Sequence, residues 1–313
     1  MPHPAQTSTH AKLHKVANLQ TRARHMQARA GLWLAAPAAL LLCVMMFVPS
    51  ALVLLLSLTD YEFGMADFAF VGLDNYAAML ADPRFRGSFA NTALYLAIVA
   101  PVSVLLALWL AVVIDGQGIF RGLYRTVFFL PVTATMVALA TAWDVLLHPT
   151  FGLVNNLLAL LGGDKLRFLS DPDTALYTLA FIGIWKQVGY NILLITAGLS
   201  TIPRNLYEAA AIDGADAGWK KFTLVTFPML GPVLLFVVVI TLIRAFSEFE
   251  TVAVLTSGGP VGATQMLLFT LYEEAFRFFK VGMASTIAVT FLAVVATVSI
   301  VQARLLDRRV HYV

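Results

Sequence analysis

The sequence predicts an all-α membrane protein with six transmembrane helices, and three observations lead to this prediction. Only 12% of the 313 residues are charged, whereas 59% are hydrophobic, and a soluble domain usually carries about 25% charged residues. The apolar residues gather in long runs, and a spanning helix needs about 20 of them. Most charged residues lie between these runs. The composition therefore excludes an ordinary soluble globular protein.

The first predicted membrane helix follows a polar N-terminal segment. Residues 1–30 contain five basic residues and no acid, so we expect a loosely ordered cytoplasmic tail. Residues 31–58 then form a run without a charge. A cleavable signal has an apolar stretch of only about 7–15 residues. The longer run therefore predicts a membrane helix and not a signal peptide.

Five further apolar runs are each long enough to span a membrane. They occupy residues 89–114, 127–147, 174–199, 233–255 and 281–303. Asp144 interrupts the third of the six predicted helices, and Arg244 and Glu248 interrupt the fifth. The transmembrane domain is expected to extend over residues 31–303, and residues 304–313 form a second tail.

The distribution of basic residues predicts the orientation, because cytoplasmic segments of membrane proteins carry an excess of Lys and Arg. One side carries 13 basic residues and the other carries 6. The richer side consists of residues 1–30, 115–126, 200–232 and 304–313. Both termini are therefore expected in the cytoplasm, and the loops 59–88, 148–173 and 256–280 outside it.

Several classes of function are disfavoured by the sequence. The net charge of +3 does not indicate nucleic-acid binding, because the basic residues are dispersed and form no stripe. The single cysteine, Cys43, excludes a disulfide framework and a cysteine-based metal site. The sequence contains no GxxxxGK[ST], HExxH or GxSxG motif. We therefore expect neither a catalytic site nor a metal or cofactor site in this chain.

The segment 202–232 is the most informative part of the chain. Its beginning predicts a short amphipathic helix with an apolar face formed by Leu206, Ala209, Ala210 and Ile212. Gly214 allows a left-handed turn, after which a second short helix contains Trp219 and Phe222. Pro228 and Pro232 mark the entry to the next span. The segment is thus expected to form a helix–turn–helix at the inner membrane face.

Reading of DNA by this helix–turn–helix is disfavoured, because it is tethered between two membrane spans and its charges are of both signs. The charges are Arg204, Glu208, Asp213, Asp216, Lys220 and Lys221. A short helix presented to the cytosol is better suited to docking in a groove of another protein.

The string EAAAIDG, followed by a hydrophobic residue and FP, resembles the "EAA" loop of inner-membrane permease subunits of binding-protein-dependent ABC importers. The segments FVGLDNY, FGLVNN and TSGGP occur in the order of that family and on the expected faces. The resemblance extends from residue 31 to the C-terminus. It is strongest to the maltose-permease-like branch of the family, which takes up carbohydrates. Within it, WKQVGYN, SGGPVGAT and LDRRVHY are most similar to sn-glycerol-3-phosphate permease subunits.

The resemblance implies a multi-pass permease of the bacterial inner membrane that imports a sugar, polyol or glycerol phosphate by alternating access. The implied partners are a second homologous permease, an ATPase dimer that holds ATP and Mg²⁺, an extracytoplasmic substrate-binding protein and membrane lipid. Docking on the ATPase would use the coupling loop, residues 202–228, through Glu208, Ala209, Ala210, Asp213 and Gly214. The binding protein would face the loops that contain Gly72, Asp74, Asn75, Gly258, Gly259 and Pro260. Those loops could equally be ordinary helix connections.

The chain departs from the family pattern after Gly214. Ten residues separate Gly214 from Val225, whereas nine is usual in the family, and Phe227 replaces the common leucine. One additional residue inside an α-helix would rotate everything after it by about 100°. We expect the turn at residues 215–218 to absorb this residue.

Charged residues within the predicted spans have two interpretations. Lys186, Arg244 and Glu248 lie at similar depths, so they could form a structural ion pair. Alternatively, they line a substrate path together with Gln187, Tyr190, Asn191 and Ser247. In the maltose permease that the chain resembles, Tyr190 matches a substrate-contacting aromatic residue and Glu248 a polar path position. Lys186 replaces an aliphatic residue there, which favours an anionic substrate.

Two rival classes of function remain in view. A secondary transporter driven by an ion gradient would show internal repeats and broken helices at mid-membrane. A membrane-embedded enzyme would show His, Asp or Ser residues clustered at one depth. Neither pattern is evident in the sequence, and the secondary transporter is kept as the alternative.

Overall fold

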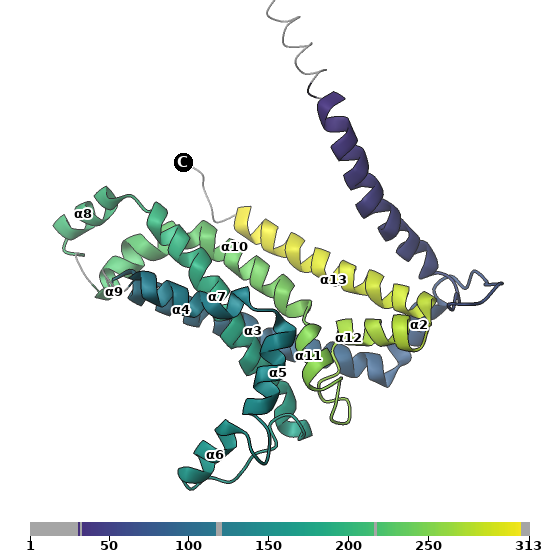
Figure 1. The fold of residues 1–313 in the computed structure, drawn as a ribbon. Helices are drawn as coiled ribbons and strands as arrows, with labels where there is room; N and C mark the ends of the chain where they lie inside the picture. The colour runs from purple at the N-terminus through teal and green to yellow at the C-terminus, as the bar shows by residue number, and fades with distance from the viewer. Residues whose placement is uncertain (1–30, 32, 117–120, 216–217, 308–313) are drawn as a thin grey trace, which may run out of the picture. The chain divides into compact units, whose positions relative to one another are not determined.

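The computed structural model divides the chain into two units, Met1–Leu55 and Leu56–Val313, which are described separately (Figure 1). The described residues are 31, 33–116, 121–215 and 218–307. The predicted N-terminal tail and the last six residues lie outside them.

The first unit contributes an apolar helix, Trp33–Leu56, whose last residue belongs to the second unit. Its 24 residues are long and apolar enough to cross a membrane. The Ser50 hydroxyl donates to the Met46 carbonyl at 2.7 Å, so this polar group is satisfied within the helix, as the hydrocarbon interior requires.

The second unit is built from helices, and its described residues contain no β-strand beyond an isolated bridge between Thr59 and Phe70. Its first half comprises α2 (Asp74–Ala81), α3 (Pro83–Asp115), α4 (Arg121–Thr133), α5 (Met136–Leu146), α6 (Leu153–Leu160) and α7 (Pro172–Thr201). Its second half comprises α8 (Arg204–Ile212), α9 (Gly218–Lys221), η2 (Phe222–Thr226), α10 (Phe227–Phe246), α11 (Glu250–Leu255), α12 (Leu267–Tyr272), η3 (Glu273–Arg277) and α13 (Val281–Asp307). The predicted all-α class is confirmed.

Two of the long helices begin at an Asp-Pro pair. Asp82 precedes α3, and its carboxylate accepts from the Arg84 amide at 2.8 Å. Asp171 precedes α7 and accepts from the Asp173 amide at 3.0 Å. The proline after each cap has no amide hydrogen to lose, and its φ angle already suits a helix. The sequence therefore fixes where both spans begin.

Among the described residues, five helices are long and apolar enough to span a membrane, and a bent pair provides a sixth span if it is counted as one. The pair is α4 and α5, which meet at 98°. Thr135 lies at the break and caps α5 by accepting from the Ala138 amide at 3.4 Å. The predicted third helix over 127–147 is therefore two helices and not one, because the threonine side chain starts a new helix.

The fifth predicted span, 233–255, is also divided. Helix α10 starts earlier, at Phe227, and ends at Phe246, and α11 follows. Glu248 lies in the break, and one of its carboxylate oxygens accepts from the Thr251 amide at 3.1 Å and the Thr251 hydroxyl at 2.7 Å. The acid that interrupts the apolar run thus caps the next helix.

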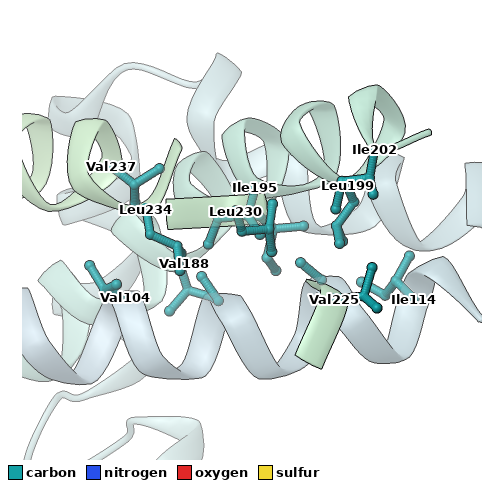
Figure 2. Close-up of a cluster of buried hydrophobic side chains, with 13 residues drawn as sticks. Val104, Ile114, Val188, Ile195, Leu199, Ile202, Val225, Leu230, Leu234 and Val237 are labelled. Carbon is teal, nitrogen blue, oxygen red and sulfur yellow. The ribbon is translucent and has the colours of Figure 1, made fainter. Parts of the chain in front are cut away.

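The largest apolar core joins α3, α7 and α10 (Figure 2). Each helix contributes side chains at spacings of three and four residues, which places them on one face. In α7 these are Val188, Ile192, Ile195 and Leu199, and Figure 2 shows Val188, Ile195 and Leu199 facing side chains of the neighbouring helices. The outer faces of the same helices expose large apolar side chains, such as Trp109 and Phe181, as expected for helices surrounded by lipid.

Helix α4 lies very close to α7 at Gly189. A Cβ atom at this position would lie 2.1 Å from the backbone oxygen of Phe128, whereas one at Gly231 in α10 would have nothing within 4 Å. Gly189→Ala should therefore force α4 away and destabilise the fold by about 1–3 kcal/mol. Gly231→Ala is the matched control and should be neutral. Thermal unfolding in detergent tests this, and equal midpoints for the two variants would contradict the close packing.

Candidate functional site

A cavity of about 330 Å³ lies where α3, α7 and α10 meet the α10–α11 break. Its charged lining consists of Lys186 on α7, Arg244 at the end of α10, and Glu248 and Glu250 around the break. Gln187 and Ser247 also line it. Five of the seven residues predicted for a substrate path therefore reach one cavity, because the break in the fifth span turns its polar residues toward α7.

The other two predicted path residues, Tyr190 and Asn191, are not in the lining of this cavity. Tyr190 lies beneath Arg244, whose guanidinium carbon is 3.9 Å from the centre of the tyrosine ring. This contact holds the arginine by a cation–π interaction. Tyr190 thus acts on the cavity through Arg244.

Asn191 is fully buried in a hydrogen-bond network that joins three helices. Its amide oxygen accepts from Gln187 at 3.1 Å and from the Thr241 hydroxyl at 3.0 Å. Its amide nitrogen donates to the Ser103 hydroxyl at 3.5 Å. These bonds connect α3, α7 and α10 beside the cavity. The network satisfies polar groups that would otherwise be costly inside a membrane.

Glu248 forms no ion pair with either cavity cation. Within the described part of the chain, ion pairs shorter than 4.0 Å join Arg84 to Glu273 and Glu274, and Arg277 to Glu273. Glu248 instead accepts from Thr251, as described above, and from the Tyr95 hydroxyl at 3.4 Å. Lys186 and Arg244 therefore share the cavity with Glu248 but form no direct ion pair with it.

Tyr95 is a residue that the sequence did not point to. It lies on α3, is 1% exposed and lines the cavity. Its hydroxyl fits against Gly183 of α7, where a Cβ atom would lie 2.1 Å away. A tyrosine in an apolar run usually indicates packing alone, so only the folded arrangement reveals its bond to Glu248.

The predicted coupling helix is present as α8, and Gly214 ends it. Gly214 has φ of +79°. Its amide donates to the Ala211 carbonyl at 3.1 Å, and the Ala215 amide donates to the Ala210 carbonyl at 2.8 Å. This is a Schellman motif, in which the residue with positive φ is normally glycine. The left-handed turn that the sequence predicts at Gly214 is confirmed.

The apolar face predicted for α8 divides between two sides of the helix. Tyr207 and Ala210 pack against the core of the second unit. Leu206, Ala209 and Ile212 are exposed instead, Ile212 to 88%, and Glu208 and Asp213 are exposed beside them. The large apolar side chains of α8 thus point away from the protein because the smaller Ala210 and the aromatic Tyr207 fill the contact with the core.

The second short helix of this segment is not separate from the fifth span. Helix α9, the π-helical turn η2 and α10 follow one another without a gap. A π-helical turn holds one residue more than an α-helical turn, and the Phe227 amide donates to the Phe222 carbonyl accordingly. A π-helical turn at residues 222–226 offers room for one additional residue before α10. The turn at residues 215–218 was expected to absorb this residue, and its residues 216–217 lie outside the described residues.

The loops expected to face a binding protein are held by side-chain hydrogen bonds. Asn75 donates to the carbonyls of Ser57 and Thr59 at 3.0 and 2.8 Å, while Gly72 has φ of +60° and Asp74 begins α2. These bonds fix the first loop against the start of the second unit.

In the third of the loops predicted to be external, Gly258 has φ of +81° and the Gly259–Pro260 peptide is cis. Asn91 donates to the carbonyls of Gly262 and Gln265, both at 3.0 Å. Val261 is left 97% exposed. The two hydrogen bonds of Asn91 therefore give the loop a defined conformation, from which Val261 projects.

Two buried acids, Glu273 and Glu274, help to hold this loop in place. Glu273 pairs with Arg84 and Arg277 and accepts from Gln265 at 2.6 Å. Burial raises the pKa of the neighbouring Glu274, while Arg84 and Lys280 act in the opposite direction. The arrangement ties α3 to η3 next to the loop.

The family model for the "Binding-protein-dependent transport system inner membrane component" matches residues 26–312. The chain belongs to this family. It is therefore a multi-pass component of the inner membrane, as the resemblance of its EAA loop predicted. The coupling segment α8 and the cavity between its spans are parts of a permease.

Relatives with assigned names agree with this family. The sn-glycerol-3-phosphate transport system permease protein UgpA of Pectobacterium atrosepticum is 33% identical over 276 residues, which cover 87% of this chain and 92% of that protein. UgpA of Agrobacterium fabrum is 32% identical and covers 89% and 95%. The probable ABC transporter permease protein YurN of Bacillus subtilis is 34% identical and covers 84% and 91%.

Solved structures share the fold. A chain of a bacterial ABC transporter involved in the import of the acidic polysaccharide alginate aligns with a TM-score of 0.80 at 21% identity, covering 92% of this chain and 100% of that one. The same transporter type in complex with an alginate pentasaccharide-bound periplasmic protein also gives 0.80, at 20% identity, covering 90% and 96%. The arrangement of helices is thus shared with chains of these transporters.

Proposed function

We propose that this chain is the permease subunit of an ABC importer and moves a sugar, polyol or glycerol-phosphate-type substrate across the inner membrane by alternating access. A separate ATPase subunit binds ATP and Mg²⁺ and hydrolyses the nucleotide. The observation that carries the proposal is α8, a short helix between two spans whose core-facing side is packed and whose opposite apolar side is exposed.

The exposed side of α8 suits docking in a groove of the ATPase. Leu206, Ala209 and Ile212 are spaced by three residues and would be buried there, and Glu208 lies beside them. Amphipathic helices commonly bind protein grooves through such anchors. The turn at Asp213 and Gly214 fixes the direction of the helix, so a movement of the ATPase is transmitted to α10 through α9 and η2.

The remaining partners follow from the same assembly. A second homologous permease completes the translocation path, and two ATPases lie on the cytoplasmic side. A substrate-binding protein docks on the external loops, where Gly258–Pro260 and Val261 form the projection. The excess of basic residues in alternate segments supports cytoplasmic N- and C-termini.

The cavity beside the α10–α11 break is proposed as part of the substrate path. Lys186 and Arg244 line it without an ion-pair partner among the described residues. This favours substrate contact over a structural ion pair. The two cations suit a phosphate ester, which would have to bind them away from Glu248 and Glu250 in the same lining, and the UgpA relatives are named for such a substrate. Broken spans like those at Thr135 and Glu248 also occur in secondary transporters, but the family model and the named relatives favour an importer permease over a secondary transporter driven by an ion gradient.

Affinity purification tests the assembly. The tagged chain, extracted from its own membrane in mild detergent, should retain a second permease and a P-loop ATPase in a fixed ratio. Retention of neither subunit, with the chain folded and monodisperse, would refute the proposed assembly.

The contact between Tyr95 and Gly183 gives a prediction for the path. Gly183→Ala should clash with the Tyr95 hydroxyl, push α3 and α7 apart beside the cavity and reduce uptake. Tyr95→Phe in the same chain should restore part of the uptake, because it removes the atom that clashes. Coupled residues show such non-additive effects. Uptake by the two single variants and the double variant decides this, and a double variant showing the product of two independent losses would contradict the contact.

A further inference from the structure

A second cavity, of about 530 Å³, lies at the base of the coupling segment and shares no lining residue with the first. It is bounded by the ends of α3 and α7 on one side and by α8, α9 and η2 on the other. In the orientation proposed above, this is the cytoplasmic edge of the membrane. Neither the coupling role of α8 nor the transmembrane path uses this cavity.

Two cations line it, Arg204 at the start of α8 and Lys221 at the end of α9. Neither has a carboxylate within 4.0 Å among the residues that the structure describes. The Lys221 ammonium lies 4.7 Å from the centre of the Tyr207 ring, which fixes its position. Asp115 also lines the cavity, so the described lining holds two cations and one acid. The lining therefore has an excess of positive charge.

Neutral donors lie close to these cations. The hydroxyls of Tyr207 and Thr226 are 3.3 Å apart, so one donates to the other and the second retains a hydrogen for a ligand. Helix α8 has no side-chain cap at Pro203, which leaves amide hydrogens at its positive end without a side-chain acceptor. A guanidinium, an ammonium and hydroxyl donors around one space match a phosphate group.

We propose that this cavity binds a phosphate-bearing anion. Its other walls include Val112, Leu199 and Phe222, which suit the apolar part of a lipid. Trp219 is 76% exposed beside the cavity, and tryptophan is typical of membrane interfaces. The cytoplasmic leaflet is rich in anionic lipids. These features favour the headgroup of an anionic phospholipid over free inorganic phosphate.

A bound headgroup would connect Arg204 on α8 with Lys221 on α9. These residues flank the turn at Gly214, and the same segment continues through η2 into α10. The anion would therefore hold the coupling helix at a fixed angle to the fifth span. This part of the inference rests on the proposed function, whereas binding itself does not.

The test is a binding measurement on the chain purified in neutral detergent with the subunits that accompany it. Short-chain phosphatidylglycerol, short-chain phosphatidylcholine and inorganic phosphate are titrated separately, and the unfolding midpoint is recorded, because a ligand that binds the folded state raises it. The variants are Arg204→Gln/Lys221→Gln and the control Lys220→Gln, a neighbouring lysine that does not line the cavity. The single variants Arg204→Gln and Lys221→Gln serve if the double variant does not fold, and Lys221→Arg is the control that retains the charge.

Phosphatidylglycerol is expected to raise the midpoint of the wild type, of Lys220→Gln and of Lys221→Arg. The double variant should bind at least about tenfold more weakly, because two charge-assisted hydrogen bonds are lost. A shift with inorganic phosphate alone would support the anion site and overturn the lipid as its source. Equal shifts in all variants, or none with either anion, would overturn the site. The readout does not depend on transport, so failure here and failure of the proposed function are distinguishable.

Discussion

Gly214→Pro is expected to separate the chain from its ATPase. Proline fixes φ near about −65°, whereas Gly214 has φ of +79°, and proline also removes the amide that donates to Ala211. The turn that ends α8 cannot form, so the exposed face formed by Leu206, Ala209 and Ile212 no longer has a fixed orientation. The amount of ATPase that co-purifies with the tagged permease should fall to background.

Gly214→Asn is the matched control, because asparagine tolerates the left-handed region better than other residues with a side chain. It should retain most of the ATPase. Glu208→Lys tests the docking face without changing the turn, and it should also release the ATPase, whereas Glu208→Gln should have a smaller effect. Normal stoichiometry in Gly214→Pro and Glu208→Lys would show that α8 is not the docking helix.

Lys186→Met is expected to reduce uptake of an anionic substrate by at least about tenfold, because a charge-assisted hydrogen bond contributes about 1.5–3 kcal/mol. The side chain lines the transmembrane cavity without a carboxylate partner among the described residues, so no buried acid is left behind. Basal ATPase activity of the assembled complex should remain, since Lys186 lies on α7 and not on the coupling segment.

The measurement compares uptake of radiolabelled sn-glycerol 3-phosphate and of a neutral sugar by wild type, Lys186→Met and Lys186→Arg. The arginine variant retains the charge and should retain part of the anion uptake. Unchanged anion uptake by Lys186→Met would remove Lys186 from the path. A loss of ATPase activity together with uptake would instead indicate a defect in assembly.

The sequence predicted some of the features that depend on neighbouring residues. The coupling helix α8 and its end at Gly214 follow from short strings, whereas the predicted spans began at residues 89 and 174 and missed the Asp-Pro starts of α3 and α7. The sequence did not predict the two helix breaks, although the bonds that cap the new helices join residues only three positions apart. The breaks beside Thr135 and Glu248 arise because a side chain caps a new helix in competition with an apolar run.

The residues of the candidate path were also only partly predictable from the sequence. Lys186, Arg244 and Glu248 could be selected from the sequence because charges within spans are rare. The role of Tyr95 could not, since its bond to Glu248 joins residues 153 positions apart. Asn191 was expected in the path but is fully buried in the network with Gln187 and Thr241. A sequence shows that a residue is polar but not which neighbour satisfies it.

The most direct test of the account is uptake by the purified complex in proteoliposomes with the binding protein added outside. ATP is enclosed or omitted, and ionophores abolish ion gradients. The account predicts uptake of sn-glycerol 3-phosphate or of a sugar that requires enclosed ATP and persists without an ion gradient. Uptake that is driven by an imposed ion gradient in the absence of ATP would contradict it.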